Sequence, residues 1–342
     1  MLKIGVQSAS WYNREDPLAS FEYIKSCGFD AVDFNIDGYV STSKLNKEGL
    51  QETFFDQSIE EILAYFTPLK EASEKTGVEI SQMHAPFPAC IVGNEELNEY
   101  IRMILDKCFA VCEYVKCPAI VVHPIGGNDE LNEYIRMAMD KCFAVCEYVH
   151  CPAIVVHPTG GATKEEEWAN NWDMYRKLIP IIKKYKGVKI CLENLFTTRP
   201  NRIEEGKLNS AEDQVKLIDT LNEEAGGDYF GFCFDVGHAI LLRKNIRDYL
   251  VTMGHRVTIL HLHDNNGVDD LHMPPYSCLA NGRNHVCNWD TLVEGLAEIG
   301  YRGVLAFETF RVFSAYPADV RTDVLKMIAS IGRSWSKRIE GT

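Results

Sequence analysis

The sequence predicts an α/β fold, a closed (β/α)8 barrel in which one αβ unit is present twice. Short apolar runs alternate with longer amphipathic segments along the whole chain, which is typical of a parallel sheet covered by helices. The apolar runs number eight when a repeated segment is counted once, and eight parallel strands close such a barrel. We therefore expect residues 1–342 to form a single barrel domain.

The expected strands and helices alternate in chain order. The helix that begins after Ser58 shows the usual start signals, because Ser58 is a good capping residue and Glu60 and Glu61 follow in the first turn. Strands are expected at residues 3–7, 31–34, 78–84, 188–193, 230–235, 257–263 and 303–308, with a further strand in each copy of the repeat. Helices are expected at residues 17–27, 58–75, 164–186, 211–225, 245–254, 289–299 and 318–334.

The repeated segment lies in the middle of the chain. Residues 93–126 and 127–160 are tandem copies of 34 residues that differ at five positions. Each copy contains one predicted helix and one predicted strand, which ends in Ala-Ile-Val-Val-His-Pro. A ninth strand would change the radius and register of the barrel. We therefore expect eight barrel strands, with one copy of the αβ unit set aside on the outside or exchanged with another molecule.

Composition and charge limit the classes of partner. Hydrophobic residues make up 46% of the chain and charged residues 25%, which are ordinary values for a globular protein. The formal net charge of −14 works against nucleic acid, because phosphate binding depends on Lys and Arg. No apolar run is long enough to span a bilayer, and the chain opens directly into a strand pattern. We therefore expect a cytoplasmic protein without a membrane partner, whose twelve cysteines are reduced and buried.

Six of the predicted strands end on imidazole or carboxylate side chains. In a barrel of this kind the carboxyl ends of the strands meet at one face, where active sites are built. Imidazoles and carboxylates are the groups that bind metal ions and transfer protons. The strand-end residues are His84, His123 or His157, Glu193, Asp235, His261 or His263, and Glu308. The sequence therefore predicts an active site at this face of the barrel.

The motifs around these residues follow a definite order along the chain. They are Met83-His84-Ala85-Pro86, Leu192-Glu193-Asn194, Phe234-Asp235-Val236-Gly237-His238, His261-Leu262-His263-Asp264, Asp270-Leu271-His272 and Phe307-Glu308-Thr309, with a Val-His-Pro in each repeat copy. In this order and spacing they resemble the xylose isomerase-like TIM barrel superfamily, and within it the sugar phosphate isomerase/epimerase family, which includes ketose 3-epimerases. The resemblance covers nearly the whole chain once one repeat copy is removed.

The resemblance implies one divalent metal ion held by Glu193, Asp235, His261 and Glu308. Carboxylate and imidazole ligands favour Mn²⁺, with Co²⁺, Mg²⁺ or Zn²⁺ as alternatives. The resemblance also implies that Glu193 and Glu308 are catalytic, one removing a proton beside a carbonyl group and the other returning a proton on the opposite face. A bound cation would stabilise the enediolate between these two steps.

Two choices between histidines arise from the sequence. Strand alternation places His261 and His263 on the same face and does not separate them. The spacing in the resembling family separates the two histidines. In that family the ligand histidine stands three residues before an acidic residue, here Asp264, and this selects His261. Of the two repeated histidines we favour His157 over His123, because the second copy connects naturally to the following helix and to Glu193. The first copy connects equally naturally to His84, and a hybrid with the first helix and the second strand in place would satisfy both ends. The other matching positions are expected to bind substrate: His84, His157, His238, Asp270 and His272.

The expected partner is therefore a small-molecule sugar or sugar phosphate, and assembly into a homo-oligomer stays open. Three alternatives remain. The first is an endonuclease IV-like metal phosphodiesterase, which the net charge opposes. The second is dehydration of an inosose or a related cyclic polyol at the same metal site. The third is a metal-binding barrel whose activity is impaired by the duplication.

Overall fold

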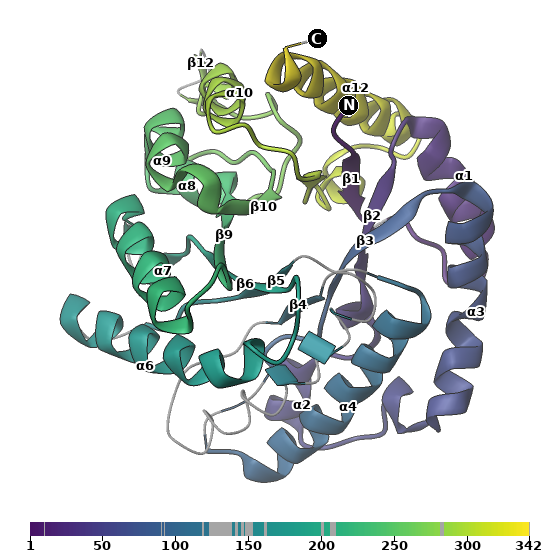
Figure 1. Cartoon of the computed structure of the whole chain (residues 1–342). Coiled ribbons are helices and arrows are strands. Elements are labelled where there is room, and N and C mark those ends of the chain that lie inside the picture. The colour runs from purple at the N-terminus through teal and green to yellow at the C-terminus, as the bar shows by residue number, and fades with distance from the viewer. Residues whose placement is uncertain are drawn as a thin grey trace.

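The chain folds as a ring of parallel strands with helices on the outside (Figure 1). A computed structural model describes residues 1–9, 11–89, 91, 93–117, 120–122, 139–140, 143–144, 147, 153–160, 163–199, 202–205, 210–280 and 284–341. The barrel architecture predicted from the sequence is confirmed. No helix in these ranges is both long and apolar enough to cross a membrane.

The strands and the main helices alternate as expected. The barrel strands are β1 (Ile4–Gln7), β2 (Ala31–Asn35), β3 (Glu79–His84), β4 (Ile120–Val122), β5 (Ala153–Val156), β6 (Lys189–Glu193), β9 (Phe230–Asp235), β10 (Val257–His261) and β13 (Leu305–Phe307). The principal helices are α1 (Pro17–Cys27), α3 (Ile59–Thr76), α4 (Glu95–Tyr114), α6 (Lys164–Ile182), α7 (Ala211–Ala225), α9 (Ile246–Met253), α10 (Trp289–Glu298) and α12 (Arg321–Glu340).

Local residues fix the ends of the helices, and Ser58 caps α3 as the sequence indicated. Ser58 accepts a hydrogen bond from the Glu61 backbone N–H, and the Glu61 side chain accepts one from the Ser58 backbone N–H, which together form a capping box for α3. At the end of α1, Gly28 has φ of 99°, a left-handed conformation that glycine adopts without a Cβ clash. The chain can then turn directly into β2.

The sheet nearly closes on itself. Its strands lie in the order β10-β9-β6-β5-β4-β3-β2-β1-β13, and every neighbouring pair is parallel. Between the two outer strands, Leu262, which follows β10, forms a parallel bridge with Phe307 of β13. The Leu262 N–H donates to the Ala306 carbonyl at 2.9 Å, and the Glu308 N–H donates to the Leu262 carbonyl at 3.1 Å. These bonds bring the end of β10 beside β13 and complete the ring.

The sheet contains nine strands instead of the eight we expected, because both repeat copies contribute a strand. β4 comes from the first copy and β5 from the second, and Val121 pairs with Val155. These two valines are equivalent residues of the repeat, 34 positions apart. Identical strands present identical edges and faces, so the second copy pairs beside the first in the same register. The expectation that one strand is set aside is therefore wrong.

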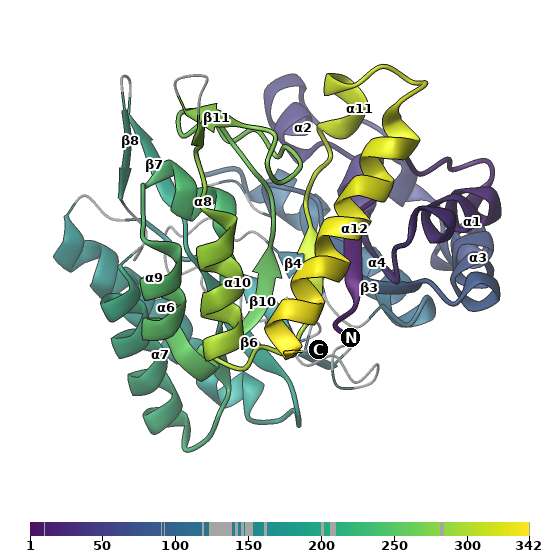
Figure 2. The same ribbon diagram turned by 90° about the horizontal axis from the view of Figure 1, so that it is seen from above.

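Several shorter elements gather at the carboxyl ends of the strands. The hairpins are β7 (Phe196–Arg199) with β8 (Arg202–Glu205), and β11 (Leu279–Ala280) with β12 (Asn284–His285). The short helices are α2 (Thr42–Glu48), α8 (Val236–Leu241) and α11 (Val312–Ala315). Most of these lie at the end of the barrel opposite both chain termini (Figure 2). Because they follow the strand ends, they surround the face where the sequence placed the active site.

Inside the barrel, beneath that face, lies a small apolar cluster that we call the barrel floor. It consists of Val121, Ala153, Val155, Cys191 and Cys233, all buried. The described cysteines are free thiols and are buried, as expected from the sequence. Cys191 and Cys233 stand two residues before Glu193 and Asp235 on the same strands, so the floor lies directly below the polar residues.

Candidate active site and metal centre

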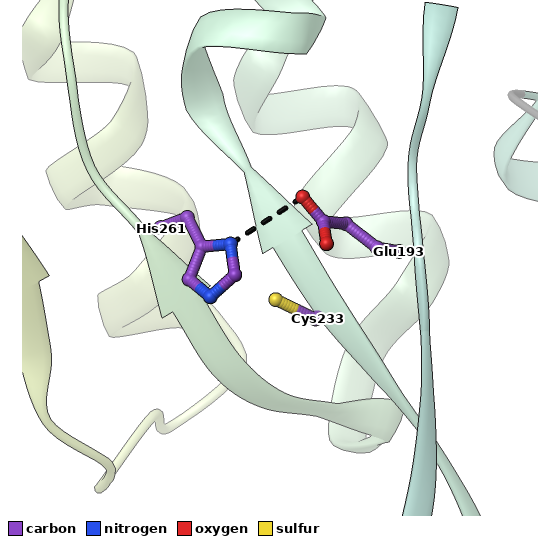
Figure 3. A group of neighbouring side chains, drawn as sticks. All are labelled: Glu193, Cys233 and His261. Carbon is purple, nitrogen blue, oxygen red and sulfur yellow. Dashed lines mark hydrogen bonds and ion pairs between the residues drawn. The ribbon is translucent and has the colours of Figure 1, made fainter. Parts of the chain in front are cut away.

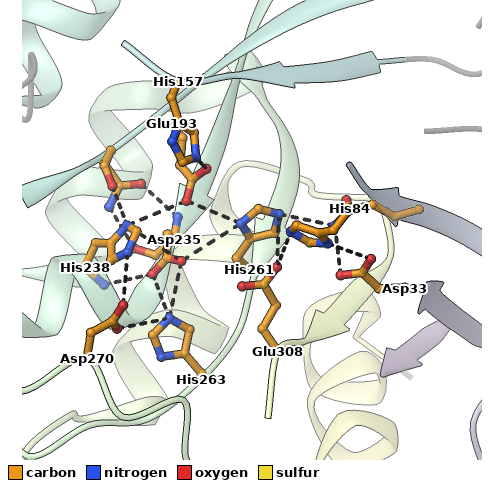
Figure 4. A network of polar contacts seen from close by, with 12 residues as sticks. Asp33, His84, His157, Glu193, Asp235, His238, His261, His263, Asp270 and Glu308 are labelled. Atoms are coloured by element: carbon orange, nitrogen blue, oxygen red, sulfur yellow. Dashed lines mark hydrogen bonds and ion pairs between the residues drawn. The ribbon is translucent and has the colours of Figure 1, made fainter. Parts of the chain in front are cut away.

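Three of the four residues predicted to bind metal lie around the imidazole of the fourth, His261 (Figure 4). Glu193, Asp235 and His261 end β6, β9 and β10, and Glu308 follows β13 directly. All four side chains are buried. His261 Nδ1 lies 3.3 Å from Glu193 Oε1 and 3.9 Å from Asp235 Oδ2, and its Nε2 lies 3.6 Å from Glu308 Oε1. The closing of the ring thus brings together residues that are far apart in the sequence.

This group fits a divalent cation. Asp235, His261 and Glu308 offer three ligand atoms that all lie within 4.8 Å of one another. Glu308 Oε1 is buried and has no hydrogen-bond partner among the described residues. The nearest imidazole nitrogens, His84 Nε2 and His261 Nε2, lie 3.4 and 3.6 Å from it, and a bound cation would give this buried oxygen a direct ligand bond. Two carboxylates and one imidazole form a mixed oxygen and nitrogen ligand set, which Mn²⁺, Co²⁺ and Zn²⁺ accept.

Both histidines of the His261-Leu262-His263 segment reach the site. His263 is fully buried, and its Nε2 lies 3.2 Å from Asp235 Oδ1. Together with Asp235 and His238 it forms a second group with metal-ligand spacing. The sequence favoured His261 over His263 as the metal ligand, and this preference stays a prediction. The geometry does make His263 a site residue, because strand alternation points both imidazoles to the same side.

The first turn of α8, directly after β9, packs closely against His263. The Asp235 side chain accepts a hydrogen bond from the His238 backbone N–H at 2.8 Å and so caps α8. A Cβ atom at Gly237 would lie 1.8 Å from His263 Cε1. Only glycine at this position leaves room for the ring. Asp235 therefore caps α8 as well as facing the imidazole of His263.

Asp270 joins two of the residues predicted to bind substrate. Its Oδ2 lies 3.7 Å from His238 Nε2 and 3.2 Å from His272 Nε2. Aromatic rings cover both imidazoles, since Phe196 meets His238 edge-on at 5.1 Å and Phe310 lies 4.4 Å from His272 between ring centres. A wall of polar groups interleaved with aromatic rings suits a small polar ligand with apolar C–H faces.

On the other side of the site, Asp33 is a residue that the sequence reasoning missed. Its Oδ1 lies 2.9 Å from His84 Nδ1, and its Oδ2 accepts a hydrogen bond from Gln82 Nε2 at 3.1 Å. His84 Nε2 in turn lies 3.4 Å from Glu308 Oε1. A carboxylate inside the apolar run Ala31-Val32-Asp33-Phe34 was the signal that could have revealed it.

The second repeat copy places His157 at the site. His157 Nε2 lies 2.8 Å from Glu193 Oε2, on the neighbouring strand. The preference for His157 agrees with this contact, whereas its equivalent His123 lies outside the described residues. His84, His157, His238, Asp270 and His272 thus all lie around the four predicted metal ligands, at contacts of 2.8–3.7 Å with members of the same network.

Imidazoles and carboxylates stabilise each other's charge here. Burial opposes ionisation of Glu193, but His157 and His261 outweigh it and hold the Glu193 pKa well below its usual range. Burial likewise opposes protonation of His238, yet Asp235 and further carboxylates raise its pKa to about 10. Asp33 and Glu308 overcome burial at His84 and raise its pKa to about 9. Without a metal ion, the site is therefore a network of paired charges near neutral pH.

The fold and the site together define a parallel α/β barrel with carboxylates and imidazoles gathered at the carboxyl ends of its strands. A sequence description of the family "Xylose isomerase-like TIM barrel" matches residues 21–329. The chain therefore belongs to the xylose isomerase-like TIM barrel family, as the motifs indicated.

Relatives and solved structures agree with this family. An uncharacterized protein, y4fM of Sinorhizobium fredii, is 34% identical over 29% of this chain and 30% of its own length. The uncharacterized protein MJ1311 of Methanocaldococcus jannaschii is 32% identical over 43% of this chain and 45% of its own. The chain thus matches less than half the length of these relatives.

Two solved structures resemble the barrel along its whole length. A D-tagatose 3-epimerase-like protein is 23% identical, with 97% of this chain and 99% of that chain covered and a TM-score of 0.54. An L-ribulose 3-epimerase is 14% identical, with 100% and 97% covered and a TM-score of 0.59. At these identities the likeness shows a shared fold.

Proposed function

We propose that the chain is a divalent-metal-dependent isomerase or epimerase of a sugar or sugar phosphate. The observation that carries this proposal is the placement of two glutamates about one imidazole. Glu193 faces Nδ1 of His261 at 3.3 Å, and Glu308 faces Nε2 at 3.6 Å (Figure 4). Epimerisation needs two proton-transfer groups on opposite faces of one carbon atom, and glutamates on either side of the site meet that need.

The chain's own residues supply the proton transfers. His157 and His261 keep Glu193 ionised, so Glu193 takes the proton from the carbon beside the substrate carbonyl. A proton returned by Glu308 would reach the same carbon from the other face, and the two glutamates exchange roles in the reverse reaction. A divalent cation held by Asp235, His261 and the two glutamates would stabilise negative charge on the substrate oxygens when bound.

The surrounding residues would hold and orient the substrate. His238, Asp270 and His272 offer hydrogen-bonding groups to hydroxyls, and Phe196 and Phe310 cover this wall with aromatic rings. Epimerase names among the solved structures of the same fold support a sugar as the substrate class. The family membership supports an isomerase or epimerase over other uses of the barrel.

The test measures proton exchange on a panel of ketoses in deuterated water. Metal-loaded protein should incorporate deuterium at the exchanging carbon and form epimers, both followed by nuclear magnetic resonance. Glu308→Gln should reduce both rates by about 10²- to 10⁴-fold, the usual contribution of a general acid or base. Glu294→Gln, an exposed glutamate on α10, is the matched control and should leave the rates unchanged. Unchanged turnover in the Glu308 variant would end the proposal.

Metal content separates this proposal from the phosphodiesterase alternative. One metal ion per chain is expected, and three zinc ions per chain would favour the alternative. Metal analysis of purified protein after dialysis against metal-free buffer measures the ratio directly.

A further inference from the structure

A buried thiol lies beside two of the predicted metal ligands. Cys233 stands two residues before Asp235 on β9, so both side chains point into the barrel. The pairing of β6 with β9 places Cys233 directly opposite Glu193. Figure 3 shows its sulfur beside the imidazole of His261 and the carboxylate of Glu193. The thiol therefore lies at the bottom of the polar site, where it meets the apolar floor.

The three side chains also have metal-ligand spacing, and two of them, Glu193 and His261, belong to the predicted ligand set already described. One ligand atom from each of Glu193, Cys233 and His261 lies within 4.8 Å of the other two. All three side chains are buried, with 2% exposure at most. The Glu193 carboxylate and the His261 imidazole are already 3.3 Å apart. Oxygen, nitrogen and sulfur donors converging on one buried point are the donor types that zinc accepts.

We propose that Glu193, Cys233 and His261 form a sulfur-containing position for a thiophilic divalent cation, and that the Cys233 thiolate selects Zn²⁺ or Co²⁺ over Mn²⁺ in this barrel. Soft thiolate ligands favour these metals, whereas oxygen ligands suit Mn²⁺ and Mg²⁺. On binding, the thiol gives its proton to solvent and a metal–sulfur bond forms, so no oxidant or reductant is needed. This proposal rests on the proposed function for the role of the metal ion. It differs from the sequence-based expectation that the metal is Mn²⁺.

The competing explanation is that Cys233 only packs. It belongs to the barrel floor with Val121, Ala153, Val155 and Cys191. Cys191 supplies the control, because it lies two residues before Glu193 on β6 and is equally buried in the same floor. A packing role predicts similar consequences for both cysteines. A ligand role predicts that only Cys233 changes the metal.

The experiment loads the metal-free full-length protein with Co²⁺ and records its absorption spectrum. Cobalt bound to a thiolate absorbs in the near ultraviolet through sulfur-to-metal charge transfer. We expect this band in the unmodified protein and in Cys191→Ser, and its loss in Cys233→Ser and Cys233→Ala. Competition between Zn²⁺ and Mn²⁺ should show a preference for Zn²⁺ that falls by about tenfold or more in Cys233→Ser.

The absence of the band in the unmodified protein, or its survival in Cys233→Ser, would overturn the inference. Circular dichroism of the metal-free variants checks that each is folded. If the Cys233 variants do not fold, X-ray absorption of the zinc-loaded unmodified protein decides, because a sulfur ligand at about 2.3 Å must then be present. Ketose turnover is measured separately. Turnover without a sulfur band would support the proposed function and reject the thiolate site. A sulfur band without turnover would support the thiolate site and reject the proposed function.

Discussion

Deleting residues 127–160 should yield a folded eight-stranded barrel with equal or higher activity. β3 pairs with β4 through His84 and Val121, and β5 pairs with β6 through Val155 and Cys191. Because Val121 and Val155 are equivalent in the repeat, one remaining strand can pair with both β3 and β6 without any change of register. The deletion therefore removes a strand without creating a mismatch at either edge.

The expected change in activity after the deletion can be estimated from the spacing between strands. Removing one strand shortens the circumference of the barrel by about 4.8 Å, which narrows its diameter by about 1.5 Å. Misplacing catalytic groups by about 1 Å can cost about 100-fold in rate. If the ninth strand holds the site too wide, the deletion should raise deuterium exchange on the active ketose by up to that factor. The retained His123 would take the place of His157 beside Glu193.

The assay compares two deletions that give nearly the same chain. Removing residues 93–126 instead of 127–160 leaves the other copy, which differs at five positions. Both variants should show a cooperative thermal transition, elute at a similar volume and have similar turnover. Loss of folding, or turnover below that of the unmodified chain, would refute the reasoning and would mean that the ninth strand has become part of the required core.

The site makes two further predictions, which are tested by chemical denaturation of metal-free protein. His84 has a folded-state pKa of about 9 against an ordinary 6.5, so its pairing with Asp33 stabilises the fold fully below pH 6.5 and loses this effect as the pH rises through 9. Asp33→Asn should therefore lower the free energy of unfolding by about 2 kcal/mol at about pH 6 and by much less at about pH 10. An equal loss at both pH values would contradict the pairing of His84 with Asp33. Gly237→Ala should lower the free energy of unfolding by about 3 kcal/mol, because the added Cβ atom would overlap the His263 ring. Adding His263→Ala should cost less than the sum of the two single changes, and additive losses would rule out the overlap.

The sequence predicted the order of elements well because their signals are local. Apolar runs and capping residues depend on near neighbours, and Ser58 caps α3 as expected, with Glu60 and Glu61 in the first turn. The hairpins of β7 with β8 and β11 with β12 were not predicted. They are short strands whose pairing depends on loops that follow the barrel strands, and strand-period patterns of two to four residues are too weak to identify.

The sequence by itself determined which residue types stand at the strand ends, and from them the family and the four predicted metal ligands. Tertiary structure decided two other matters. Whether the second repeat strand joins the sheet depends on edge pairing between strands 34 residues apart in the chain, and Val121 beside Val155 shows that it does. Which side chains meet at the site depends on strand register across the closed ring, which brings Asp33 to His84 and Cys233 to Glu193. Periodicity along one strand gives the direction in which a side chain points, but its partner across the barrel is fixed only when the ring closes.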